Sequence, residues 1–233
     1  MRPVSAAFGV GALAAWCGPA AAPVVPILGR LFHIPLRLPG TRGIAITFDD
    51  GPHPEGTPAV LELLETAGVR ATFYLVGEQV ERRPSLAAEI AAAGHEIGIH
   101  GYRHTLLLRR GPGAIRDDLD RAAAIIGEAT GRKSLSYRPP YGVFSLAGLQ
   151  IARERWSPLL WTRWGRDWER KATPESIVRL ATRDLGARDV VLLHDADFYS
   201  VEGSWRRTVA ALPRVLDQAL ATGEPLVAAS QST

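Results

Sequence analysis

The sequence is poor in several features that define common protein classes. It holds a single cysteine, Cys17, which excludes a disulfide framework and a cysteine-based zinc site. Only Lys133 and Lys171 are lysines, and the 27 basic residues exceed the 24 acidic ones by just three, without forming a run. We therefore expect no nucleic-acid partner. No G-x-G-x-x-G motif follows the first expected strand, which argues against dinucleotide binding.

Charge is also missing from the N-terminal region. No charged residue occurs in residues 3–29. Residues 4–17 are typical of the apolar part of a signal peptide, and the three alanines at 20–22 offer a cleavage site. Pro23 disfavours cleavage, so an uncleaved membrane anchor is the alternative, although prolines and small residues interrupt the stretch.

Over the whole chain, 46% of residues are hydrophobic and 22% are charged, which is the composition of a globular protein. We divide the chain into a signal peptide or membrane anchor (residues 1–30), a connecting segment (31–42) and one folded domain (43–233). This division predicts an extracytoplasmic protein, either secreted or attached to the membrane by its N-terminal segment. The sequence does not indicate an oligomeric state.

Apolar runs and helical patterns alternate through that domain. Short apolar or β-branched runs predict strands, over residues 43–48, 71–76, 96–100, 135–138, 158–161, 189–193 and 226–228. Helical spacing and capping residues predict the intervening helices, over residues 57–67, 84–93, 114–127, 146–153, 173–185 and 206–221. Such alternation predicts an α/β fold, a distorted (β/α) barrel of about seven parallel strands, with an open doubly wound sheet as the alternative.

Reactive side chains follow the expected strands. Asp49 and Asp50 come after the first strand, and His100 ends the third, with His104 four residues later. In a parallel barrel all strand C-termini open on one face, so these groups would converge there. Two imidazoles and a carboxylate form a metal-ligand set that leaves positions for water and substrate. The alternative for the two aspartates alone is an Asx turn.

Three further polar groups are expected at the same face. Arg138 ends the fourth strand and His194 the sixth, while Asp167 follows the fifth by a few residues. Beside two prolines that fix the backbone, Arg138 suits a clamp on a carboxylate. His194 could instead be a buried core histidine, and the tryptophans around Asp167 could be core aromatics. Tryptophans at a barrel mouth also suit the apolar faces of sugar rings.

Taken together, these residues resemble the NodB-type polysaccharide deacetylases, a family of metal-dependent carbohydrate esterases. The resemblance covers residues 43–229 and rests on five motifs in the family's order: Thr47-Phe48-Asp49-Asp50-Gly51-Pro52-His53-Pro54, His100-x-x-x-His104, Arg138-Pro139-Pro140-Tyr141-Gly142, Asp167-Trp168 and Leu192-Leu193-His194. The chain departs from the family pattern at Gly101, where Ser or Thr is usual, and at residues 164–166, where an acidic residue is usual.

The resemblance implies a role for each matching residue. Asp50, His100 and His104 would hold a divalent metal, most often Zn²⁺, with Co²⁺ or Ni²⁺ also used. Asp49 would be the general base and His194 the general acid. The supporting positions are those that orient these groups or receive the acetyl group: Arg138 beside Asp49, Asp167 beside His194, Trp168 and Leu192 around the acetyl methyl, and the Tyr141 backbone N–H on the carbonyl oxygen.

The implied activity is removal of acetyl groups from an N-acetylated polysaccharide or oligosaccharide, such as chitooligosaccharide or peptidoglycan, with release of acetate. Three alternatives remain from the sequence. The first is an O-acetyl esterase acting on xylan or a similar polymer through the same metal centre. The second is a non-catalytic carbohydrate-binding protein of the cell envelope. The third, a cytosolic amidohydrolase acting on a small cyclic amide, is disfavoured by the apolar N-terminus.

Overall fold

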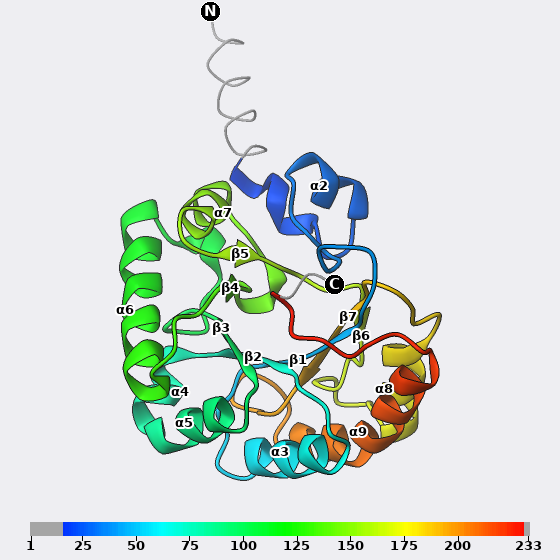
Figure 1. The fold of residues 1–233 in the computed structure, drawn as a ribbon. Helices are drawn as coiled ribbons and strands as arrows, with labels where there is room; N and C mark the ends of the chain where they lie inside the picture. Colours follow the sequence, from blue (N-terminus) through cyan, green and yellow to red (C-terminus); the bar gives the residue numbers. More distant parts are fainter. Residues whose placement is uncertain (1–15, 231–233) are drawn as a thin grey trace, which may run out of the picture.

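The structure, a computed structural model, describes residues 16–230 and contains one seven-stranded sheet with helices around it (Figure 1). The strands are β1 (Ala45–Asp49), β2 (Thr72–Leu75), β3 (Glu96–Ile99), β4 (Ser136–Tyr137), β5 (Ser157–Pro158), β6 (Arg163–Trp164) and β7 (Val190–His194). All pairings are parallel, in the order β5-β4-β3-β2-β1-β7-β6. The predicted α/β barrel of seven parallel strands is confirmed, with its wall open between β5 and β6, which do not pair.

Helices form the outer layer. The α-helices are α2 (Pro26–Leu31), α3 (Gly56–Thr66), α4 (Gly77–Arg82), α5 (Pro84–Ala92), α6 (Pro112–Thr130), α7 (Leu146–Arg153), α8 (Pro174–Thr182) and α9 (Ser204–Ala221). Three 3₁₀ turns complete the set: η1 (Gly18–Ala21), η2 (Leu107–Arg109) and η3 (Pro140–Gly142). Every residue of β1 and β2 is buried, as expected for parallel strands covered on both faces.

Several elements differ from those expected. Of the strand expected over residues 158–161, only Pro158 is part of a strand, β5, and residues 159–161 lie in the connection to β6. The seventh strand is β6, not residues 226–228, of which Leu226 makes only an isolated bridge to Ile44. The helix α4 was not expected. Its six residues include only one large apolar side chain, Val80, so the sequence has no periodic pattern there.

The N-terminal part of the described chain packs on the barrel. Ala22, Ile34 and Leu38 are buried in the main hydrophobic core. The Leu160 N–H donates to the Pro35 carbonyl (2.9 Å), which places this segment over the opening between β5 and β6. In Figure 1, η1 lies between α2 and α7, and it contacts both helices.

Half of the predicted signal peptide or anchor, residues 1–15, lies outside the described residues. Among residues 16–230, no helix combines the length and hydropathy needed to cross a bilayer.

Candidate active site

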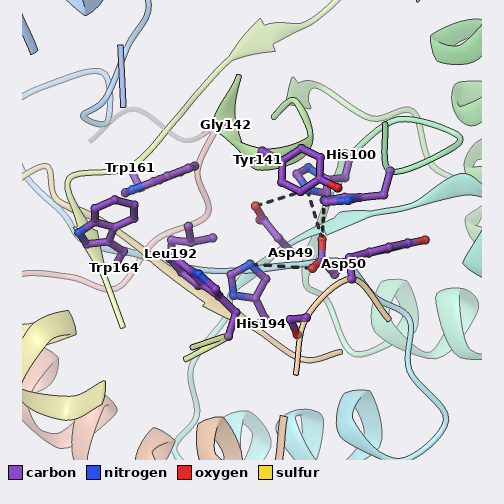
Figure 2. A pocket seen from close by; sticks show the side chains of 13 residues that line it. Asp49, Asp50, His100, Tyr141, Gly142, Trp161, Trp164, Leu192 and His194 are labelled. Carbon is purple, nitrogen blue, oxygen red and sulfur yellow. Dashed lines mark ion pairs between the residues drawn. The ribbon is translucent and has the colours of Figure 1, made fainter. Parts of the chain in front are cut away.

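A cavity of about 400 Å³ opens at the carboxyl ends of the strands. Eight of the ten predicted site residues line it (Figure 2): Asp49, Asp50, His100, His104, Tyr141, Trp168, Leu192 and His194. The other two, Arg138 and Asp167, are fully buried behind the wall and contact Asp49 and His194. The structure therefore brings all ten together.

Backbone conformation explains how the two adjacent aspartates reach one cavity. Successive side chains in an extended strand point to opposite sides. Asp49 ends β1, but Asp50 has φ +79°, a left-handed conformation that aspartate tolerates better than most residues. The chain turns there, and both carboxylates line the cavity.

Three potential metal ligands converge from β1 and from the loop after β3. Asp50 Oδ1 lies 3.4 Å from His100 Nε2 and 3.3 Å from His104 Nε2. One ligand atom from each of the three residues lies within 4.8 Å of the others. The spacing allows one ion to contact all three.

Hydrogen bonding shows that this cluster fits a cation. His100 Nδ1 lies 2.8 Å from the Arg138 carbonyl oxygen. A carbonyl can only accept, so Nδ1 carries the hydrogen, and in the neutral form of the ring the lone pair is on Nε2, which faces Asp50. Asp50 Oδ1 is buried and receives no hydrogen bond from the described residues. Acceptors that face one another in this way need a positive charge between them.

His104 is held between two tyrosines. Its ring stacks on Tyr199 at 4.2 Å with an interplanar angle of 11°, and the ring of Tyr141 meets it edge-on at 4.4 Å. Burial lowers the pKa of His104 to about 4, against the opposing effect of Asp50. The imidazole is therefore neutral at physiological pH, which is the form that binds metals.

Arg138 joins β1 to the segment that connects β5 and β6. Its Nη1 donates to Asp49 Oδ1 (2.7 Å) and to Thr47 Oγ1 (2.8 Å). Its Nε and Nη2 donate to the carbonyls of Leu159 (3.1 Å) and Leu160 (2.9 Å). Because Arg138 occupies Oδ1, the other carboxylate oxygen of Asp49 is left facing the cavity.

His194 and Asp167 form a buried ion pair on the other side of the cavity. His194 Nδ1 lies 2.8 Å from Asp167 Oδ1, and Asp167 Oδ2 accepts from the His194 backbone N–H and from Thr208 Oγ1 (both 2.7 Å). Burial opposes protonation of the imidazole, but the Asp167 charge outweighs it and raises the pKa of His194 to about 10. A protonated Nε2 thus faces Asp50 at 4.0 Å.

The far wall of the cavity is apolar. Trp168 meets the His194 ring edge-on at 5.2 Å, and Leu192 is nearly buried beside it. Figure 2 places Leu192, Trp161 and Trp164 on the side away from Asp50. Tyr141 adopts φ +61°, a strained backbone conformation of the kind found at functional sites.

Sequence reasoning missed Tyr199. It lies in the loop after β7 and lines the cavity. Its hydroxyl donates to Glu78 Oε1 (2.8 Å) and accepts from Gln79 Nε2 (3.0 Å), both on α4. No motif marks either segment, so only the tertiary structure reveals this support for His104.

Asp118 is the second residue that the sequence analysis missed. Its Oδ2 accepts from the Tyr102 backbone N–H (2.8 Å) and so holds the loop between His100 and His104. A Cβ added at Gly101, whose φ is +88°, would lie 3.3 Å from the same oxygen. Asp118 is an acid on the buried stripe of α6, and that placement was the available signal.

Comparisons with known proteins agree with this geometry. A family model described as polysaccharide deacetylase matches residues 38–155, just over half of the chain. A peptidoglycan-N-acetylglucosamine deacetylase of Bacillus cereus is 35% identical over 192 residues, which cover 81% of this chain and 86% of that protein. A chitooligosaccharide deacetylase of Azorhizobium caulinodans is 32% identical over 188 residues, covering 77% and 89%.

Solved structures give the same result. A crystal structure of the Bc1960 peptidoglycan N-acetylglucosamine deacetylase in complex with 4-naphthalen-1-yl-N-oxidanyl-benzamide superimposes with a TM-score of 0.78 at 26% identity, covering 86% of this chain and 93% of that one. The family model covers the chain from β1 to α7, and the two relatives and the superposed structure cover 77–86% of it. The chain belongs to the polysaccharide deacetylase family, as its motifs predicted.

Proposed function

We propose that the protein is a metal-dependent hydrolase that removes acetyl groups from N-acetylated carbohydrate and releases acetate. One observation carries the proposal: a complete Asp-His-His ligand set lies between a carboxylate and a protonated imidazole. Asp49 Oδ2 lies 3.8 Å from His100 Nε2, and His194 Nε2 lies 4.0 Å from Asp50 Oδ2. A base and an acid on opposite sides of one electrophilic centre are what amide hydrolysis requires.

Asp50, His100 and His104 would hold the metal. Two imidazoles and one carboxylate suit Zn²⁺ with an open coordination position, and Co²⁺ or Ni²⁺ accept the same ligands. A divalent cation at this position would polarise the acetyl carbonyl and lower the pKa of a water molecule.

Asp49 then acts as the general base. Arg138 fixes its Oδ1, so the free Oδ2 is held in the cavity to accept a proton from the attacking water. Because Arg138 is fully buried and makes four hydrogen bonds, the position of the carboxylate is set before substrate binds.

His194 acts as the general acid. Asp167 keeps its ring protonated, and Nε2 directs that proton into the cavity, where the leaving nitrogen of the sugar would receive it. General acid–base assistance of this kind contributes about 10²- to 10⁴-fold to a rate.

The remaining predicted residues would receive the acetyl group. Leu192 and Trp168 form the apolar side of the cavity, which suits a methyl group, and the tryptophans nearby suit sugar faces. Tyr141 also lines the cavity, and its backbone N–H would donate to the developing oxyanion.

Acetate release is the direct test. We expect the metal-loaded protein to release acetate from chitooligosaccharide or peptidoglycan, to lose this activity with a chelator and to regain it on addition of Zn²⁺. Acetylated xylan is the comparison substrate, because faster release from xylan would favour the O-acetyl esterase alternative. Absence of acetate release from every substrate, with the metal bound, would overturn the proposal.

We also propose that the N-terminal apolar segment directs export. The support is the uncharged sequence of residues 3–29. Fractionation of cells that express the full chain, with N-terminal sequencing of the exported form, would distinguish a cleaved signal peptide from a membrane anchor. Recovery of the whole chain in the cytosol would contradict export.

A further inference from the structure

A second cavity, of about 710 Å³, adjoins the catalytic one. It lies where residues 23–37 cover the open side of the barrel between β5 and β6. Trp161 and Trp164 line both cavities, so these two indoles form a shared wall. Pro23 lies at the junction, since a Cβ added at Gly142 on the catalytic rim would come within 3.2 Å of it.

We call this cavity the basic groove, because positive side chains dominate its polar lining. Among the residues that the structure describes, no aspartate or glutamate lines it. Its charged members are four arginines from three separate segments: Arg30, Arg37, Arg163 and Arg188. One buried carboxylate lies behind them: Asp189, 1% exposed, pairs with Arg37 (2.9 Å) and Arg163 (3.1 Å). Four arginines and one aspartate leave a net charge of +3.

Two of the arginines are available to a ligand. Arg30 is exposed on α2 and makes no ion pair within residues 16–230. Arg188 donates its Nε to the Leu38 carbonyl (2.9 Å), and it also pairs with no carboxylate within residues 16–230. Guanidinium groups without carboxylate partners beside an apolar wall are suited to bind a carboxylate.

A line of aromatic rings leads from the general acid to this groove. Trp168 lies 5.2 Å from the His194 ring, Trp164 lies 5.7 Å from Trp168, and Trp161 lies 5.8 Å from Trp164. Trp161 is buried, but Trp164 and Trp168 are partly exposed. Because sugar rings stack on indole faces, a glycan that binds at His194 and extends along these two indoles would run toward the arginines.

We propose that the basic groove is a subsite for the carboxylate-bearing part of an N-acetylated glycan. The inference rests on the proposed deacetylase function and specifies its substrate class. The preferred glycan would carry acid substituents on its sugars, such as lactyl ethers, rather than being a neutral polymer of N-acetylglucosamine. The charge acts on binding and not on the chemical step, because the arginines lie outside the catalytic cavity.

A matched set of tetrasaccharides tests this. The first is neutral and made only of N-acetylglucosamine. The second carries a lactyl ether with a free carboxylate on alternate sugars, and the third is the second with its carboxylates converted to amides. We expect the double variant Arg30→Gln/Arg188→Gln to lose about 5- to 20-fold in kcat/KM on the acidic glycan, mainly through KM. Its kcat/KM on the neutral and amidated glycans should change less than twofold.

Two control variants isolate the contribution of the basic groove to glycan preference. Arg179→Gln removes one positive charge from the exposed face of α8, as Arg30→Gln does from the groove, and should affect the three glycans equally. Arg30→Gln alone leaves the Arg188 contact to Leu38 intact, so a smaller selective loss is expected even if the double variant is unstable. Higher ionic strength should reduce the preference of the unmodified protein for the acidic glycan.

The outcomes separate this inference from the proposed function. Equal activity of the unmodified protein on acidic and amidated glycans would refute the inference that the basic groove binds carboxylates. Equal losses on both glycans in the variants would refute it as well. If no glycan is deacetylated, the proposed function fails, but calorimetric binding of the acidic and amidated tetrasaccharides still tests the groove. Equal affinity for the two would then refute it.

Discussion

The ion pair between His194 and Asp167 should determine the alkaline limit of activity. In Asp167→Asn, an amide replaces the carboxylate that lies 2.8 Å from His194 Nδ1. Asp167 is the leading cause that raises the pKa of this imidazole to about 10, and burial works in the opposite direction. Without the negative charge, we expect the pKa of His194 to fall to its ordinary value near 6.5 or lower.

The loss can be estimated from protonation alone. At pH 8, a group with a pKa of about 10 is almost fully protonated. A group with a pKa of about 6.5 is only about 3% protonated at that pH. If His194 delivers its proton to the leaving nitrogen, kcat/KM at pH 8 should fall about 30-fold or more, and the loss should shrink as the pH is lowered toward 6.

Rates of acetate release between pH 5 and 11 measure this directly. The control is Thr208→Val, which removes one hydrogen bond to Asp167 (2.7 Å) but keeps the ion pair. It should leave the alkaline limit near that of the unmodified protein. An Asp167→Asn variant that retains metal and keeps its activity up to pH 10 would refute the assigned role of Asp167.

Other parts of the site give three further predictions. Asp49→Asn should retain the metal, measured by elemental analysis, and lose at least 100-fold in kcat, because the amide cannot accept a proton; near-full activity would refute its role as base. His100→Ala should lose both metal and turnover, whereas retained stoichiometric metal would contradict its role as a ligand. Arg138→Met should destabilise the metal-free protein by ~3–5 kcal/mol in urea unfolding, because it leaves Asp49 buried without its partner; a change below 1 kcal/mol would show that the pair does not support the fold.

Most of the barrel follows from local sequence. The strand β7 reads as an apolar run because it is buried on both faces, and helices such as α8 carry their own caps, here a Thr173–Ser176 capping box. The strand β6 has only two residues, an arginine and a tryptophan, so no alternation could reveal it. It forms because the neighbouring strand β7 supplies its hydrogen bonds.

The candidate site was predictable for a related reason. Its ten residues lie within a few residues of strand C-termini, and a parallel barrel brings these ends together whatever lies between them in sequence. Tyr199 and Asp118 support the same site, but Tyr199 lies on a loop and Asp118 on an outer helix. Tyr199 stacks on His104 and is held by Gln79 on α4, and Asp118 on α6 accepts the Tyr102 N–H. These contacts depend on how α4 and α6 pack, which no local pattern encodes.

The contact made by Asp118 also explains how the loop is held at Gly101, where the family pattern usually has Ser or Thr. A serine or threonine at that position could brace the loop only from within, through its own hydroxyl. In this chain the brace comes from α6, whose carboxylate accepts the Tyr102 N–H at 2.8 Å and fills the space beside Gly101. With φ at +88°, glycine also avoids the strain that any side chain would add. The loop that carries His100 and His104 is therefore held by a different residue, and the absence of a hydroxyl at position 101 does not imply a loosely held loop.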